Sequence, residues 1–206
     1  MKKFRFNFRK DFRLDALCND DVLRPVQGNI FFSDNRAWVT DSRLLFRMDL
    51  DAISTLPTPS IEKLNDKAIH KDVFKKLLAY DEIIPLDDKI EARKYKNDVV
   101  DYFEYAKLTR GEKSEWGFFE NSMKPLLSQY LSLEDTQSDH TTYSFAEIKK
   151  IWDAFGSYTA FRTFYKKDRA GSPFSVIIPY IHGDKYATPN ESDNVPIIGL
   201  LMGFVD

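Results

Sequence analysis

Residues 28–50, GNIFFSDNRAWVTDSRLLFRMDL, decide the fold that the sequence predicts. Apolar, aromatic and β-branched residues fill three short runs, and Asp, Asn and Ser separate these runs at residues 33–35 and 41–42. Such polar side chains bond nearby backbone groups and favour tight turns, whereas the flanking residues favour extended chain. We therefore predict three strands joined as an antiparallel meander.

Two stretches further along the chain each place a lysine pair between large apolar residues: DVFKKLLAY (72–80) and AEIKKIWDAF (146–155). Both patterns predict a helix with one apolar side. In the first helix Asp72 is the expected N-cap, and the apolar residues share one face: Val73, Phe74, Leu77, Leu78 and Tyr80.

The second helix has stronger end signals. Ser144 is the expected N-cap, with Glu147 three residues later in the capping-box arrangement, and Gly156 is expected to end the helix. The predicted apolar stripe consists of Ile148, Ile151, Trp152 and Phe155.

Weaker patterns predict the remaining helices and strands. Alternation predicts a strand in KFRFNFR (3–9), a short helix is expected in 11–20, and residues 51–66 are expected to connect, with at most one helical turn. A further helix is predicted at 122–132, and the remaining strands at 88–95, 99–108, 159–167, 174–181 and 196–205.

A helix followed by a meander therefore occurs twice, which indicates an internally repeated α+β fold with extended antiparallel sheets. We place the boundary between two units in the polar stretch after Thr109. The predicted domains are residues 1–110 and a second, reduced domain at 111–206.

Composition limits the classes of protein. The 206 residues include 30 Lys and Arg against 32 Asp and Glu, so nucleic-acid binding would depend on how the charges are distributed. The single cysteine excludes an intrachain disulfide and fits a reducing compartment. No signal peptide is expected, and no run approaches the roughly 18 apolar residues of a membrane span. We expect a cytoplasmic protein without membrane contact.

Residues 23–50 resemble a segment of the bacterial-type DNA sliding clamp, the processivity subunit of replicative DNA polymerase. The similar features are a proline turn, a small-residue bend before a strand, and a strand that ends in Thr-Asp; here they are Pro25, Gly28-Asn29 and Thr40-Asp41. KAIHKDVFKKLLAY (67–80) and the region from 144 to 206 are similar to other parts of that family. Two domains per chain imply three copies in a closed ring, hence a possible homo-oligomer.

The resemblance implies a noncatalytic protein for DNA replication or repair, without cofactor, with a clamp-like fold. Its helices would contact duplex DNA through phosphates, without reading sequence. The candidate DNA-binding residues are Arg9, Lys10, Arg13, Lys71, Lys75, Lys76, Lys149 and Lys150. Polymerase or repair proteins would dock linear peptides in an apolar pocket lined by Val176, Ile178, Leu201 and Met202.

The candidate DNA-binding and pocket residues also have simpler structural interpretations. Helical lysines commonly face water, and residues of a terminal strand are commonly core. The protein is then an interaction module of clamp-like fold that no longer binds DNA. Asp41 is best explained as a turn residue.

An enzyme is the least favoured class. His70, His140 and His182 are far apart in sequence and have no metal-like spacing, and Cys18 is more simply a buried, inert thiol than a nucleophile. A small hydrolase is therefore the third alternative.

Overall fold

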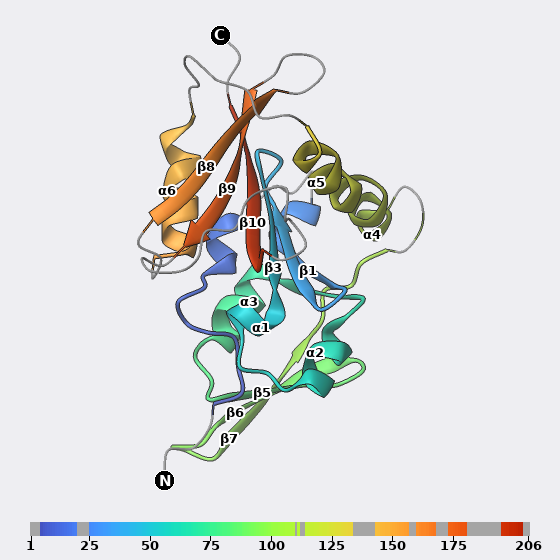
Figure 1. Ribbon diagram of the computed structural model, residues 1–206. Helices are drawn as coiled ribbons and strands as arrows, with labels where there is room; N and C mark the ends of the chain where they lie inside the picture. Colours follow the sequence, from blue (N-terminus) through green and yellow to red (C-terminus); the bar gives the residue numbers. More distant parts are fainter. Residues whose placement is uncertain are drawn as a thin grey trace.

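Helices cover both faces of a seven-stranded antiparallel sheet in the computed structural model (Figure 1). The structure describes residues 5–19, 25–109, 111, 114–133, 143–156, 160–167, 173–180 and 195–203. The strand order is β4-β1-β2-β3-β10-β9-β8. Their bounds are β1 Asn29–Ser33, β2 Arg36–Thr40, β3 Leu44–Asp49, β4 Lys67–His70, β8 Ala160–Lys167, β9 Pro173–Tyr180 and β10 Ile197–Met202.

The predicted meander of residues 28–50 is confirmed as β1, β2 and β3. The sheet continues beyond it, because β10 pairs antiparallel with β3 and aligns Met48 with Ile197. Strands from both predicted domains, 1–110 and 111–206, therefore belong to one sheet. The division of the chain into two clamp-like domains stays a prediction.

One face of the sheet carries the larger apolar cluster. Its strand residues alternate with those of the opposite face; Phe32, Val39 and Phe46, for example, are fully buried on this side. The helices that contribute to this cluster are η1 Leu14–Leu17, α1 Leu50–Ile53, α2 Thr58–Leu64, α3 Lys71–Leu77 and α6 Phe145–Ala154.

The opposite face is covered by one continuous helical segment made of α4 Glu115–Phe118, the π-helix η3 Phe119–Met123 and α5 Lys124–Leu131. The short helix η2, Pro25–Gly28, adds Val26 to the same cluster. Phe119 stacks on Phe31 of β1, with ring centroids 4.8 Å apart. Figure 1 shows this segment and α6 on opposite sides of the sheet.

A second, three-stranded sheet follows α3, with strands β5 Glu82–Pro85, β6 Lys89–Lys94 and β7 Val99–Glu104. The order α3 then β5–β7 matches the order α6 then β8–β10, so a helix followed by an antiparallel meander occurs twice. The predicted α+β class with antiparallel sheets is confirmed.

Gly199 permits the close packing at the junction of β3 and β10. It lies opposite Phe46 in the register, and an added Cβ would lie 2.4 Å from the nearest carbon of the Phe46 ring. That ring also packs against Phe155, the residue that follows α6, with centroids 5.1 Å apart. Any larger residue at 199 would therefore displace an aromatic ring of the core.

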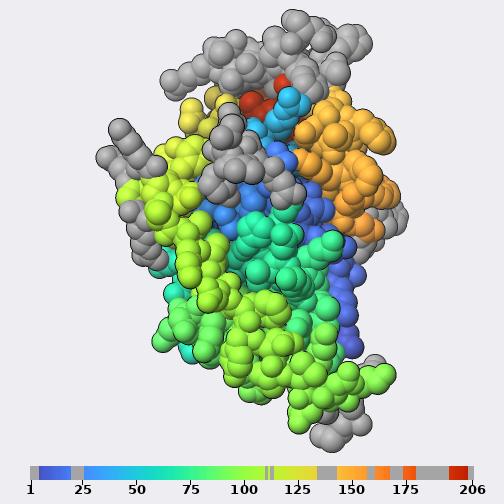
Figure 2. Space-filling model, turned by 180° about the vertical axis from the view of Figure 1, so that it is seen from behind, coloured from blue at the N-terminus to red at the C-terminus, as the bar shows by residue number. Residues whose placement is uncertain are grey.

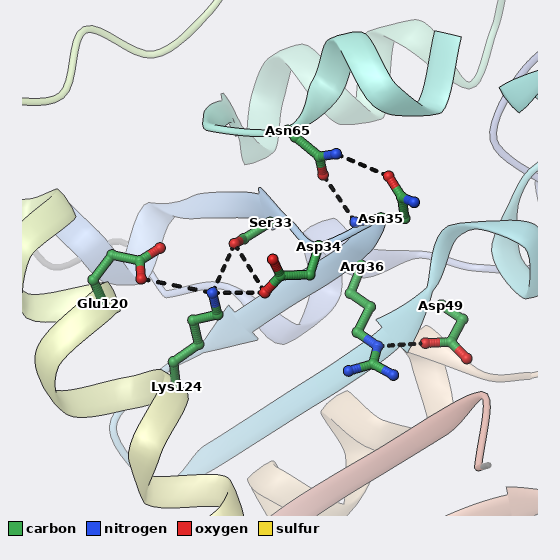
Figure 3. A network of polar contacts seen from close by, with 8 residues as sticks. All are labelled: Ser33, Asp34, Asn35, Arg36, Asp49, Asn65, Glu120 and Lys124. Carbon is green, nitrogen blue, oxygen red and sulfur yellow. Dashed lines mark hydrogen bonds and ion pairs between the residues drawn. The ribbon is translucent and has the colours of Figure 1, made fainter. Parts of the chain in front are cut away.

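The β1–β2 turn anchors the helical segment of the opposite face (Figure 3). Asp34 and Asn35 have positive φ values of 55° and 59°, as a tight hairpin turn requires. Lys124 reaches this turn and lies 2.7 Å from the Asp34 carboxylate and 2.9 Å from the Ser33 hydroxyl. The hydrogen bond from Lys124 is the main cause that lowers the pKa of Asp34.

Some local expectations are wrong. Residues 5–9 form only isolated bridges, because Asn7 and Phe8 are both buried while Phe6 is 37% exposed, which breaks the period of two. Residues 51–66 contain α2 and most of α1 rather than a single turn. The four-residue strands β4 and β5 were not predicted from the sequence.

Candidate functional site

An N-terminal segment, residues 7–13, fastens α3 to the rest of the molecule. The buried Asn7 amide donates hydrogen bonds to the Leu77 carbonyl (2.8 Å) and the Tyr80 carbonyl (2.9 Å). Leu77 is the last residue of α3 and Tyr80 lies in the turn that follows, where few intrahelical donors are left for the carbonyls. Phe8 packs on Phe74, with ring centroids 4.8 Å apart.

The same segment then reaches α6. Phe12 contacts Phe155 edge to face at a centroid distance of 6.3 Å, and the Arg13 amide donates to the Ala154 carbonyl at 3.0 Å. The two lysine-pair helices are thus held through their C-terminal ends on one face of the sheet. We call the exposed surface of residues 9–13, α3 and α6 the helical face.

Five of the eight predicted DNA-binding residues are exposed on the helical face: Arg9, Lys10, Lys75, Lys76 and Lys149. Within the described ranges Arg9, Lys10, Lys75 and Lys76 form no ion pair. Lys71 is half-buried at the start of α3 and has further interactions. Of the five exposed cations, the four without an ion pair retain an unneutralised charge.

Two of the other cations have a carboxylate partner on a neighbouring turn. Arg13 donates to both oxygens of Asp15, at 2.9 and 2.7 Å, and this hydrogen bonding raises the pKa of Arg13. Lys149 pairs with Asp153 at 2.5 Å along α6. Lys149 and Asp153 are both exposed, so this pair contributes little to stability and can be broken by a stronger anion.

Lys150 instead has a structural contact. Its ammonium pairs with Asp41, whose side chain is buried in the turn between β2 and β3. The other Asp41 oxygen accepts hydrogen bonds from the amides of Arg43 (2.9 Å) and Leu44 (2.8 Å), which confirms the interpretation of Asp41 as a turn residue. The pair ties α6 to the sheet.

The caps of the two helices are partly as predicted. Ser144 accepts a hydrogen bond from the Ala146 amide at 3.2 Å, as expected of an N-cap. At α3 the prediction of Asp72 is wrong, because His70 is the N-cap and its Nδ1 accepts from the Asp72 amide. Gly156 follows α6 but does not adopt a positive φ, so any residue suits its backbone.

The predicted apolar stripe of α6 is wrong in part. Ile151 is buried as expected, but Ile148 is 43% exposed and Trp152 is 59% exposed, and Phe145 at the helix start is 82% exposed. Glu147 is turned into the protein instead; its Oε2 has no hydrogen-bond partner in the part of the chain that the structure describes. The helical face thus combines cations with large apolar side chains.

The predicted peptide-pocket residues lie on both faces of the sheet. Val176 and Ile178 are buried in the cluster that also holds α5, with Met202 partly buried against it. Leu201 is buried in the cluster of the opposite face. A peptide pocket shared by these four residues stays a prediction.

A cavity of about 520 Å³ lies elsewhere, between η2, the β2–β3 turn and the segment α4–η3–α5. Its lining residues are Val26, Gln27, Thr40, Ser42, Leu45, Ser114, Glu115, Phe118, Ser122, Met123 and Leu126. No local sequence pattern predicts this cavity, because its lining comes from segments that are separate in the chain.

The structure describes two of the residues considered for catalysis, Cys18 and His70. Cys18 is buried, and desolvation raises the pKa of its thiol. His70 caps α3, while His140 and His182 lie outside the described residues. No three His, Cys, Asp or Glu side chains of the described chain are grouped to hold a metal ion. Among the described helices, none has the length and apolar character needed to cross a bilayer.

The chain was compared with known proteins at the levels of family, sequence and structure. No protein-family model, curated protein or solved structure matches it. A function for the protein therefore has to follow from the chemistry of its own surfaces.

Proposed function

We propose that the protein is a noncatalytic, clamp-like tethering protein that contacts duplex DNA through the helical face, without sequence preference, and holds polymerase or repair proteins through linear peptides. One observation carries the proposal. The two lysine-pair helices and the basic N-terminal segment share one face of the sheet, and Arg9, Lys10, Lys75 and Lys76 are exposed there without ion-pair partners among the described residues.

The chemistry of this face suits a phosphate backbone. Lysine and arginine side chains on a helix surface reach phosphates without reading base edges, and each neutralised phosphate releases counterions. Since the formal net charge is only −2, binding would depend on this local concentration of cations. It should be weak, nonspecific and sensitive to salt.

The direct test is the salt dependence of binding to a labelled duplex, measured by fluorescence anisotropy. For B-DNA the slope of log K against log salt is about −0.9 per phosphate contact, so the double variant Lys75→Gln/Lys76→Gln should reduce the magnitude of the slope by about 1.8. The control is Lys107→Gln, which should leave the slope unchanged. Lys107 is exposed after β7 and lines a hollow with Trp116, a residue of the apolar cluster on the opposite face.

In Figure 2 the yellow-green residues after β7 and the orange α6 region lie at opposite sides of the molecule. An equal loss of slope per removed charge in the control and in the double variant would indicate a general charge effect and would contradict binding by the helical face. Absence of any binding at low salt would reject the DNA part of the proposal.

A second candidate is an interaction module of clamp-like fold that does not bind DNA. The exposed Phe145, Ile148 and Trp152 on α6 favour it, because three large apolar side chains on one helix are typical of a protein-docking surface. This candidate predicts no salt-sensitive retention on closed circular DNA. The oligomeric state, measured by light scattering, is a separate criterion. A ring-forming clamp requires a stable oligomer, so a strict monomer would contradict ring formation.

A further inference from the structure

The cavity between η2, the β2–β3 turn and the segment α4–η3–α5 has the form of a small-molecule site. Its volume of about 520 Å³ is within the usual range of ligand pockets. Val26, Leu45 and Met123 are buried apolar residues of its lining. Phe118 and Leu126 also line it and are 49% and 37% exposed, so they form its open rim.

The helical wall of the cavity has an unusual backbone. The π-helix η3 spans Phe119–Met123, within otherwise α-helical chain, and such segments are frequent at functional sites. Ser122 and Met123 of this segment line the cavity. The next residue, Lys124, is bound to the β1–β2 turn (Figure 3), so the wall is held in place without a ligand.

Among the lining residues that the structure describes, Glu115 supplies the only charged side chain. Thr109 donates to Glu115 Oε2 through its hydroxyl (2.7 Å) and its amide (3.1 Å), which fixes the carboxylate at the start of α4. The hydroxyl bond is the main cause that lowers the pKa of Glu115, so the group is an anion near neutral pH. The other polar lining groups are hydroxyls and one amide, which are uncharged.

We propose that this cavity binds a small amphiphilic cation, with the apolar body against Leu45, Met123 and Phe118 and the amine beside the Glu115 carboxylate. Burial of the apolar body supplies the driving force, and a charge-assisted hydrogen bond selects the head group. A carboxylate of the same shape would be repelled by Glu115. The site is independent of DNA contact, since its residues lie on the opposite face of the sheet from α3 and α6.

Three ligands with the same chain test the head-group selectivity: octylamine, octanol and octanoate, each titrated calorimetrically below its aggregation concentration at neutral pH. Octylamine should bind about tenfold more tightly than octanol, because hydrogen bonds to charged groups are the stronger ones. Octanoate should bind more weakly than octanol. Equal affinities for amine and carboxylate, or no saturable binding of any ligand, would overturn the proposal.

Two variants test the location. Glu115→Gln should abolish the preference for octylamine over octanol while octanol binding persists. Ser122→Phe, at an exposed lining position, should fill the cavity and weaken all three ligands about tenfold or more. Ser128→Phe is the matched control, since Ser128 is exposed on the adjoining α5 and does not line the cavity.

An unchanged preference in Glu115→Gln would assign the amine to another site. Equal effects of Ser122→Phe and Ser128→Phe on binding would show that the apolar body of the ligand lies outside this cavity. Circular dichroism spectra of each variant establish that it is folded, and the charge test with Glu115→Gln stands even where Ser122→Phe fails to fold.

Discussion

Gly199→Ala tests the junction between β3 and β10, and it should lower the free energy of unfolding by about 2 kcal/mol. Three carbons of the Phe46 ring lie within 2.6 Å of the added Cβ, and the ring is held against Phe155, so it cannot swing aside freely. Overpacking of this kind costs up to about 3 kcal/mol. Replacement of glycine also lowers the conformational entropy of the unfolded chain, which stabilises the fold by only ~0.5–1 kcal/mol. The destabilisation by the clash is therefore larger.

Thermal and urea denaturation measure this effect. For a chain of this length, a loss of about 2 kcal/mol corresponds to a fall in Tm of about 4–8 °C. Gly156→Ala is the matched control: its added Cβ would meet only the Trp152 carbonyl oxygen at 3.5 Å, and its φ is not positive. That variant should leave stability unchanged or raise it slightly.

A double-mutant cycle separates the clash from other effects. Phe46→Leu removes the ring that the new methyl group meets, so the two substitutions together should cost less than the sum of their separate costs, by about 1 kcal/mol or more. A stable Gly199→Ala protein, or strictly additive costs, would show that Phe46 does not lie over Gly199. The pairing of β10 with β3 would then be refuted.

Three further outcomes follow from the contacts described. Asp41→Ala should destabilise by about 3 kcal/mol in urea denaturation, because it removes two turn hydrogen bonds and the buried partner of Lys150. Lys150→Met should also destabilise clearly, because it leaves the buried Asp41 carboxylate without its cation, and an unchanged stability of either variant would contradict this contact. Asn7→Ala should cost about 2 kcal/mol, since the carbonyls of Leu77 and Tyr80 each lose a buried hydrogen bond, and an unchanged stability would contradict this bridge. Burial, together with the hydrogen bond to Asp101, raises the pKa of Tyr80 to about 12. Because the unfolded phenol ionises near 10, stability should fall between pH 10 and pH 12, and Tyr80→Phe should remove that part of the pH dependence.

Local sequence information was sufficient for the meander of residues 28–50. Turn residues and strand-forming residues alternate there over short distances, and both signals act within a few neighbours. The strands β4 and β5 have only four residues each, and β4 is defined by its pairing with β1, which places Asn29 opposite His70. Such a strand depends on a distant partner, so a local pattern cannot predict it.

The orientation of α6 shows a second limit. Hydrophobicity favoured a stripe that includes Ile148 and Trp152, whereas the helix buries Glu147 and Ala154 beside Ile151. The rotation of the helix is decided by where it docks, and the contact of Lys150 with the β2–β3 turn is part of that docking. The candidate cavity has the same origin, since it exists only after η2, the β2–β3 turn and the α4–α5 region have come together.

The place of β10 in the sheet has a consequence for biosynthesis. The ribosome releases β1, β2 and β3 early, but the second edge of β3 obtains its partner only when residues 197–202 have emerged. Until then a strand with the apolar residues Leu44, Leu45 and Phe46 presents an unpaired edge, which is a template for aggregation. The nascent chain should therefore depend on chaperone protection for most of its synthesis, and cotranslational closure of the sheet should be a late event.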